Sequence, residues 1–146
     1  MPSITTEWDN EQKTAIRVTY QPGWTWDDVE HNMTVELELL ESVSHRVDVI
    51  EDFRGTRLPP GAVRQLPKIA ESPPYTHPNS GLVIMVGDVT FLDKLVAIYK
   101  SVYGRAQKLH TQPDLDAARA FIEDHYTRQT QETPAARYGQ DEDDGQ

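Results

Sequence analysis

The sequence contains no cysteine among its 146 residues. Without thiols the chain can form no disulfide, and it has no thiolate to serve as a nucleophile or to bind zinc or an iron–sulfur cluster. Long apolar runs are also missing, since the ~18 consecutive apolar residues of a membrane-spanning helix occur nowhere. The opening residues MPSITTEWDN lack the basic and apolar segments of an export signal, so we expect a cytoplasmic protein without a membrane span.

Basic residues are few. The sequence has 14 lysines and arginines and 24 aspartates and glutamates, which gives a formal net charge of -10. A surface that follows nucleic acid needs clustered Lys and Arg, so we expect no nucleic-acid partner. The charge is more typical of a soluble chain than of a particular binding role. The length and the 37% hydrophobic content indicate one globular domain.

Sequence patterns of catalytic and metal sites are absent as well. The histidines, at positions 31, 45, 77, 110 and 125, have no metal-ligand spacing, and GxSxG, GxGxxG and GxxxxGK[ST] do not occur. Acidic neighbours such as Asp27-Asp28 and Glu51-Asp52 point apart on a helix or strand, so adjacency does not make them an acid–base pair. We therefore predict no metal site, no cofactor and no enzymatic activity.

The stretch from Gly81 to Gly104 organises the predicted fold. Leu82 to Val86 are five apolar residues in a row and predict a strand covered on both faces. Thr90 and Asp93 have the spacing of a capping box, which predicts a helix from Thr90 to Tyr103 that ends at Gly104.

The residues before this stretch predict a hairpin and a long helix. Alternating apolar residues indicate antiparallel strands over Ile4–Trp8 and Ile16–Tyr20. A capping box of Thr25 and Asp28 then starts a helix that ends near Val43, with a core-facing stripe formed by Trp26, Val29, Met33, Leu37 and Leu40. Val35 and Leu39 lie off that stripe, which leaves open a homodimer contact or cover by a neighbouring loop.

The next segments predict a strand, a helix and a connector. Residues 46–53 are rich in β-branched residues and predict a strand. Its Asp48 and Glu51 indicate that the strand has solvent-exposed ends or lies nearer a sheet edge than the strand of Leu82 to Val86. A helix follows Pro59-Pro60, and Pro67 should kink or restart it. Residues 72–80 contain three prolines and read as an exposed connector.

The C-terminal part predicts a last strand over 108–110 and a last helix. Thr111 and Asp114 repeat the helix-start pattern, and apolar spacing continues to His125. Residues 127–146 have almost no large aliphatic side chains, so we predict a folded domain over 1–126 and a disordered acidic tail over 127–146.

The resulting order is β-β-α-β-α-β-α-β-α. A hairpin followed by alternating helices and strands predicts an α/β fold, with a mixed, mostly parallel sheet of about five strands and helices packed on it.

Several segments of the chain resemble the STAS domain, in particular the SpoIIAA-like group of small bacterial proteins that is sometimes classed with Sec14-type domains. The matching segments are Gly23-Trp24-Thr25-Trp26, Val49 to Gly55 followed by Leu58-Pro59-Pro60-Gly61, His77-Pro78-Asn79, Val86-Gly87, and Asp116-Ala117-Ala118-Arg119. The resemblance covers roughly residues 4 to 126. It implies a non-catalytic regulatory module that docks to a protein partner or receives a small ligand.

In anti-sigma-factor antagonists of this fold, a serine after the Asp-ending strand is phosphorylated, which adds charge to the docking surface. No serine lies between Asp52 and Leu66 here, and Thr56 is the only hydroxyl side chain in that segment. We therefore expect the module to work without the serine switch.

Ligands of open α/β sheets bind at the carboxyl ends of the strands. This rule selects loop and helix-start residues as candidates for binding a partner or ligand: Asp52, Arg54, Thr56, Arg57, Pro59, Gly61, Gly87, Asp88 and Thr90. An alternative function is a carrier or sensor of a lipid or other apolar small molecule. Its candidate pocket is formed by Tyr20, Trp24 and Trp26 beside the helix of residues 90–103.

Overall fold

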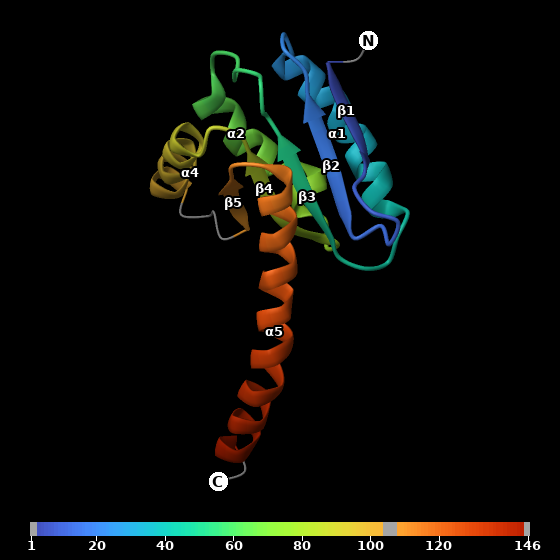
Figure 1. Cartoon of the computed structure of the whole chain (residues 1–146), viewed down its shortest axis with the longest axis vertical. Coiled ribbons are helices and arrows are strands. Elements are labelled where there is room, and N and C mark those ends of the chain that lie inside the picture. Colours follow the sequence, from blue (N-terminus) through green and yellow to red (C-terminus); the bar gives the residue numbers. More distant parts are fainter. Residues whose placement is uncertain (1–2, 104–107, 145–146) are drawn as a thin grey trace.

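A five-stranded mixed sheet forms the centre of the molecule. The structure, a computed structural model, describes residues 3–103 and 108–144. Within them the strands lie in the order β1-β2-β3-β4-β5 (Figure 1), with bounds Ile4–Trp8, Ala15–Tyr20, Val47–Asp52, Ser80–Val86 and Leu109–Gln112. β1 and β2 are antiparallel and the other neighbours are parallel. The predicted α/β fold class is confirmed.

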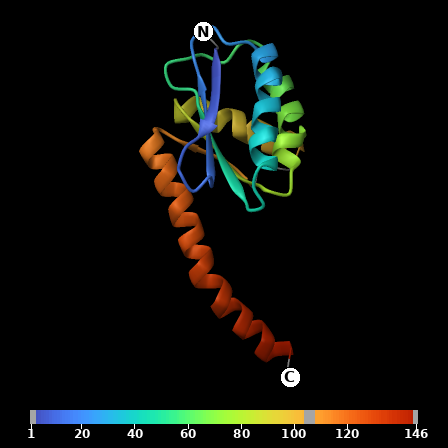
Figure 2. The same cartoon turned by 90° about the vertical axis from the view of Figure 1, so that its right-hand side faces the viewer.

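Helices cover both faces of the sheet. Those described are α1 (Trp26–Glu41), α2 (Ala62–Ala70), α3 (Pro73–Thr76), α4 (Val89–Tyr103) and α5 (Leu115–Asp144). α1 packs on β1 and α3, and α4 packs on β5 and α2, whereas α5 packs on β3, β4 and β5. Figure 2 shows α1 and α5 on opposite sides of the sheet. The predicted helix stop at Gly104 lies outside the described residues.

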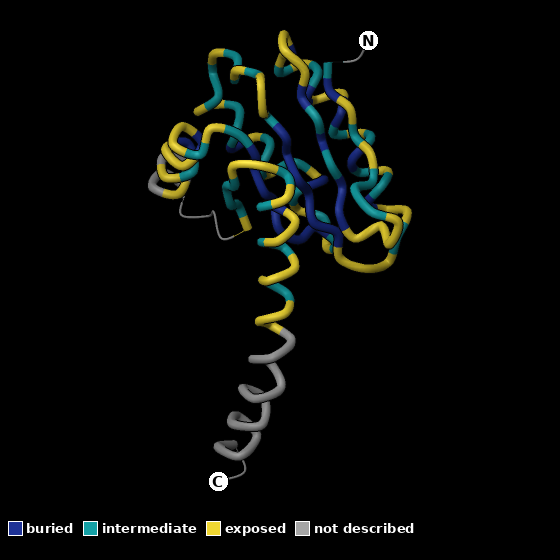
Figure 3. Tube along the Cα trace, in the orientation of Figure 1, coloured by how far each residue is buried: buried dark blue, intermediate teal, exposed yellow. Residues whose placement is uncertain are grey.

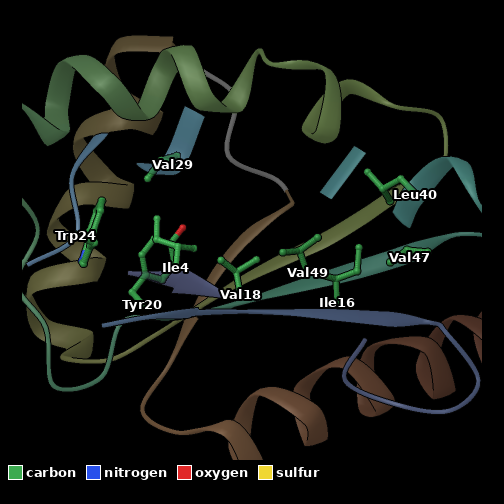
Figure 4. Close-up of a cluster of buried hydrophobic side chains, with 9 residues drawn as sticks. All are labelled: Ile4, Ile16, Val18, Tyr20, Trp24, Val29, Leu40, Val47 and Val49. Carbon is green, nitrogen blue, oxygen red and sulfur yellow. The ribbon is translucent and has the colours of Figure 1, made fainter. Parts of the chain in front are cut away.

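The apolar core divides into three clusters. The cluster between the sheet and α1 contains Ile4, Ile16, Val18, Tyr20, Trp24, Val29, Leu40, Val47 and Val49 (Figure 4). The cluster under α5 contains Ile50, Leu82, Ile84, Val86 and Ala118. The third cluster, formed by Met85, Leu92 and Leu95, lies under α2 and α4. Because neighbouring side chains of a strand point to opposite faces, β3 and β4 contribute to clusters on both sides.

The two central strands are buried along their whole length (Figure 3). This confirms the prediction that Leu82 to Val86 form an interior strand. The prediction that β3 has wet ends or lies near an edge is wrong, because β3 pairs with β2 and β4. The two acids that motivated the prediction are buried with partners instead: Asp48 accepts hydrogen bonds from Leu82 N and Tyr126 Oη, and Glu51 accepts from two tyrosines.

The helix starts follow the prediction at one of three places. Thr25 and Asp28 form the expected capping box at α1. At α4, Asp88 accepts from the first-turn N–H groups, so Thr90 is not the cap. At α5 the cap is Asp114, which accepts from the Ala117 N–H at 2.7 Å. In both cases an aspartate directly precedes the helix, and its carboxylate reaches those N–H groups.

The buried stripe of α1 is rotated from the predicted one. The buried residues are Val29, Asn32, Glu36 and Leu40, while Trp26, Met33 and Leu37 are half-buried. Leu39 packs against the cluster under α1, which favours cover within the domain over a homodimer contact for this residue.

The segment between β3 and β4 also departs from expectation. α2 contains Pro67 without a restart, and it begins after Gly61, whose φ of 95° is left-handed. Pro67 removes a hydrogen bond to the carbonyl of Val63, but Val63 is 53% exposed, so water can replace it. The predicted exposed connector contains the short helix α3, and Pro74 within it is buried.

α5 extends to Asp144, although the sequence predicts a disordered tail from residue 127. Residues 127–144 include helix formers such as Arg128 and Ala135 but also Pro134 and Gly139, which disfavour a helix, so intrinsic propensity does not account for the extension. The described side chains that pack α5 on the sheet end with Tyr126. Beyond them, Figure 1 shows the helix projecting past the sheet.

We expect a chain that ends at Gln129 to be as stable as the full chain. The contacts of the described α5 side chains with the second cluster end at Tyr126, so the free energy of unfolding should change by no more than about 0.5 kcal/mol. Urea unfolding followed by circular dichroism measures this difference. A clear loss of stability would instead place residues 130–146 in the folded domain.

Candidate functional site

Two of the predicted site residues bind each other at the carboxyl end of β3. Arg54 donates to both carboxylate oxygens of Asp52, from Nε to Oδ1 at 2.9 Å and from Nη2 to Oδ2 at 3.0 Å. Its backbone N–H also donates to Oδ1. The hydrogen bonds that the exposed Arg54 guanidinium donates to Asp52 raise its pKa. Because the Arg54 guanidinium and the Asp52 carboxylate bind each other, these two charged groups are already engaged within the loop.

A groove lies next to this loop, between the residues that follow β3 and the start of α4. It has a volume of about 350 Å³ and is lined by Phe53, Thr56, Arg57, Leu58, Asp88, Phe91 and Leu92. We call it the loop–helix groove. Its volume is in the range of ligand pockets, which is about 300 to 1,000 Å³. The structure therefore brings together Thr56, Arg57 and Asp88 from two separate predicted segments.

The polar groups of the groove differ in how far they are engaged. Asp88 accepts from the N–H groups of Thr90 and Phe91. The Thr56 hydroxyl donates to Phe53 O and accepts from Trp24 Nε1 at 3.3 Å. Arg57 is exposed and is the only basic side chain among the described lining residues. It is thus the groove's available positive charge.

The remaining predicted residues support this region. A Cβ at Gly87 would make an ordinary van der Waals contact with Leu92 Cδ1 at 3.5 Å, so the φ of 157° favours glycine there and lack of space does not. Gly61 precedes α2 in a left-handed conformation, and Trp26 Nε1 donates to the neighbouring Pro60 carbonyl at 2.8 Å. Pro59 and Thr90 do not line the groove.

A second cavity lies within the domain, among aromatic side chains. It has a volume of about 70 Å³ and is lined by Tyr20, Trp24, Trp26, Val29, Glu51, Phe53, Leu58, Leu66, Ile69, Ala70, Val83, Met85 and Leu109. We call it the aromatic cavity. The three predicted pocket residues do line it together. Among the described side chains, the helical lining comes from α1 and α2, and none comes from the helix of residues 90–103 that we expected beside the pocket.

Four aromatic rings in this cavity contact one another at different angles. Tyr20 stacks on Phe53 with centroids 4.2 Å apart, and Trp24 lies 4.8 Å from Tyr20. Trp24 and Trp26 meet edge to face at 5.0 Å. Figure 4 shows Tyr20 and Trp24 close together on one side of the sheet. Rings from β2, the following loop, α1 and the end of β3 therefore meet at one place.

A pair of buried acids adjoins the aromatic cavity. The Tyr20 hydroxyl donates to Glu51 Oε2 at 2.5 Å. The Tyr75 hydroxyl donates to Glu51 Oε1 and lies 3.5 Å from Glu36 Oε1. Glu36 and Glu51 are only 2% and 4% exposed. The tyrosines therefore link the two carboxyl groups.

Burial dominates the electrostatics of this cluster. It raises the pKa of Glu36 well above its ordinary value, and the charge of Glu51 adds to this effect. Burial also raises the pKa of Glu51, against the hydrogen bonds from the two tyrosines. Burial and the same acids raise the pKa of Tyr20 and Tyr75. The pair therefore tends to retain a proton at pH values above the ordinary glutamate pKa of 4.5.

Our sequence interpretation missed the main members of this cluster. Glu36 lies seven residues after Val29 and four before Leu40, and this spacing indicates the buried face of α1. Tyr75 has no comparable signal, because it comes from a proline-rich segment without a periodic pattern. In the loop–helix groove, our sequence interpretation also missed Phe91, which is 47% exposed, because no sequence pattern marks it as a binding residue.

Neither a metal site nor a membrane-spanning helix is found among the described residues. No group of three or more histidine, aspartate or glutamate side chains among residues 3–103 and 108–144 is arranged to hold a metal ion. In the same part of the chain, none of the helices has the length and apolar character needed to cross a membrane.

The chain was compared with known proteins in three ways. Comparisons with protein-family models, with curated proteins and with solved structures find no match.

Proposed function

We propose that the chain is a non-catalytic regulatory module of the STAS-like type, which binds a protein partner through the loop–helix groove. The single observation that carries this proposal is the exposure of Phe91 beside Arg57 in a groove of about 350 Å³. The resemblance to STAS domains supports it. So does the five-stranded mixed sheet, which is of the kind that the resemblance implies.

The side chains of the groove have the character of an interface. Aromatic residues and arginine are enriched among residues that dominate binding energy at protein interfaces. Within the described residues, Phe91 and Val63 are the large apolar side chains left exposed, and Phe91 is the one that lines the groove. Because the Thr56 hydroxyl is held by Phe53 O and Trp24, the described groove has no nucleophile paired with a base.

The charges of the groove suggest the chemistry of the partner. Asp88 is occupied by the N–H groups of α4, and Arg54 by Asp52, so Arg57 remains to meet an incoming charge. A partner segment that places an apolar side chain on Phe91 and a carboxylate on Arg57 satisfies both. We expect this segment to belong to a different cytoplasmic protein, and a second copy of this chain is the alternative occupant.

Charge and polarity changes in the groove should weaken partner capture. We expect Arg57→Glu and Phe91→Asp each to lower the amount of partner recovered with the tagged chain from native lysate by about tenfold, because each removes a central interface contact. Quantitative mass spectrometry of the recovered proteins measures this, and circular dichroism checks that the variants fold.

The matched control is Val63→Asp, which places the same charge at an exposed apolar position outside the groove. It should recover the same proteins as the unchanged chain. If all three variants recover the same set in the same amounts, the groove is not the binding surface. Sedimentation of the purified chain separates the alternative, since a dimer that Phe91→Asp dissociates identifies a second copy as the occupant.

A second candidate function is the carriage of a small molecule in the aromatic cavity. The observation that favours it is the convergence of Tyr20, Trp24 and Trp26 on one cavity. Its volume of about 70 Å³ is smaller than the roughly 150 Å³ of an engineered cavity that binds benzene, so a lipid tail does not fit the cavity as it stands. A native mass spectrum of the freshly purified chain tests for a retained ligand.

A further inference from the structure

The buried acids lack a positive partner. Among the described residues, no lysine, arginine or histidine forms an ion pair with Glu36 or Glu51. The groups that face them are Tyr20 from β2 and Tyr75 from α3, both of which donate hydrogen bonds and carry no positive charge. Buried acids are usually paired, because an isolated charge in the interior is strongly unfavourable. Here the protein supplies donors but no countercharge.

The aromatic cavity lies directly against one of these acids. Among the described lining residues, Glu51 and Tyr20 are the ionisable side chains, and most of the others are aliphatic or aromatic. Aromatic rings attract organic cations through their electron-rich faces, and the attraction is strongest where the cation is desolvated. Rings around a carboxyl group are therefore suited to a cation that also has apolar surface.

We propose that the aromatic cavity binds the head of a small alkylammonium ion, with Tyr20, Trp24, Trp26 and Phe53 around its methyl groups and Glu51 as its countercharge. The inference rests on the second candidate function and adds the class of ligand. It is independent of the loop–helix groove. The volume of about 70 Å³ limits the buried part of the ligand to a few non-hydrogen atoms.

Binding of a cation should be coupled to release of a proton. In the empty cavity, burial and mutual repulsion favour the protonated form of the Glu36–Glu51 pair. A cation beside Glu51 favours the ionised form, so a proton leaves the pair when the cation enters. Tyr20 and Tyr75, which also face the pair, have pKa values raised well above 10.0 and remain protonated. The affinity for the cation should therefore increase with pH.

The experiment is a titration of the full chain with trimethylammonium chloride and, separately, with tert-butanol, a neutral molecule of similar size. Isothermal titration calorimetry in two buffers of different ionisation enthalpy gives the affinity and the number of protons released. Nuclear magnetic resonance follows the indole N–H signals. Trp24 and Trp26 line the cavity, whereas Trp8 does not and serves as the internal reference.

We expect trimethylammonium to bind at least about tenfold more tightly than tert-butanol, to release protons at pH 6, and to shift the Trp24 and Trp26 signals but not that of Trp8. Glu51→Gln should lose about tenfold in affinity for the cation, whereas Glu11→Gln, which removes a charge from the exposed β1–β2 turn, should bind as the unchanged chain does. Should Glu51→Gln fail to fold, proton release by the unchanged chain still decides the question.

Three results would overturn the proposal, in distinguishable ways. Equal binding of tert-butanol without proton release would keep the cavity as a small-molecule site but reject a cationic ligand. Absence of binding by both probes would reject the second candidate function together with the proposal. Equal shifts of all three tryptophan signals would indicate non-specific attraction to the acidic chain. None of these results bears on the groove.

Discussion

The free energy of unfolding should fall as the pH rises from about 5 to 8, and Glu36→Gln should remove much of this fall. The cause is the buried pair of Glu36 and Glu51, whose pKa values are both raised above the ordinary 4.5 by burial. One unit of difference in pKa between the folded and unfolded chain corresponds to about 1.4 kcal/mol. The two acids together make this one of the largest effects that we expect.

The direction follows from proton linkage. Between 4.5 and the raised pKa, the folded chain holds a proton that the unfolded chain has released. Stability from such a group is fully present below pH 4.5 and is lost as the pH rises toward the folded pKa. Asp48, whose pKa is also raised by burial, acts in the same sense above its ordinary 3.8.

Asp9 has the opposite effect on the free energy of unfolding, and it has this effect at low pH. Burial opposes its ionisation, but hydrogen bonds from Arg119 and Arg17 outweigh burial and lower its pKa. Its contribution is present above the ordinary value of 3.8 and is lost as the pH falls below it. Stability should therefore be greatest in mildly acidic solution, between the loss from Asp9 and the loss from the buried pair.

Glu36→Gln replaces a protonated acid by a neutral side chain of the same shape, which still offers an oxygen to Tyr75. We expect it to raise the free energy of unfolding by about 1 to 3 kcal/mol at pH 8 and to change it little at pH 4.5. Urea unfolding at a series of pH values measures both. Glu38→Gln, at an exposed position of the same helix, is the matched control and should leave the pH dependence unchanged. An unaltered slope in Glu36→Gln would show that this acid is ionised in the folded chain.

The fold could be predicted because its signals are local. The apolar run of β4 indicates a fully buried strand, and the alternation of apolar and polar residues in β1 and β2 indicates strands with one buried face. The order of strands and helices then limits the possible topologies. Helix starts were less predictable. Thr90 and Thr111 have the spacing of a capping box, yet Asp88 and Asp114 directly precede their helices and accept from the free N–H groups.

The candidate sites were predictable only in part, because they depend on partners distant in sequence. The strand-end rule selected Thr56, Arg57 and Asp88, which the structure places in one groove. The same rule could not show that Asp52 and Arg54 bind each other. For Glu51, an acid in a strand suggested exposure, since sequence alone does not reveal the two tyrosine hydroxyls that allow its burial.

Asp48 joins the central strands to α5 and is the basis of the second large effect. Its Oδ1 accepts from Leu82 N at 2.7 Å and from Tyr126 Oη at 2.6 Å, and the carboxylate is almost fully buried. The Arg46 guanidinium lies 3.3 Å above the centre of the Tyr126 ring. One oxygen atom therefore satisfies a backbone N–H of β4 and fixes the last packed turn of α5.

Asp48→Ala should lower the free energy of unfolding by about 2 to 4 kcal/mol, because it leaves the buried Leu82 N–H and the half-buried Tyr126 hydroxyl without an acceptor. Adding Tyr126→Phe to Asp48→Ala should cost little more, since the tyrosine hydroxyl has already lost its acceptor. Gly81→Ala tests the same contact without removing the acid. A Cβ at residue 81 would lie 2.3 Å from Asp48 Oδ1, and moving that oxygen breaks both hydrogen bonds.

Urea unfolding measures each of these variants, with Glu11→Ala on the exposed β1–β2 turn as the control for loss of an acid. The control should be within about 0.5 kcal/mol of the unchanged chain. Additive losses for Asp48→Ala and Tyr126→Phe would contradict a shared contact. Full stability of Gly81→Ala would mean that Asp48 can turn away without loss, and α5 would then be held by the apolar cluster of Ile84, Ala118 and their neighbours and by the ion pair of Arg119 with Asp9.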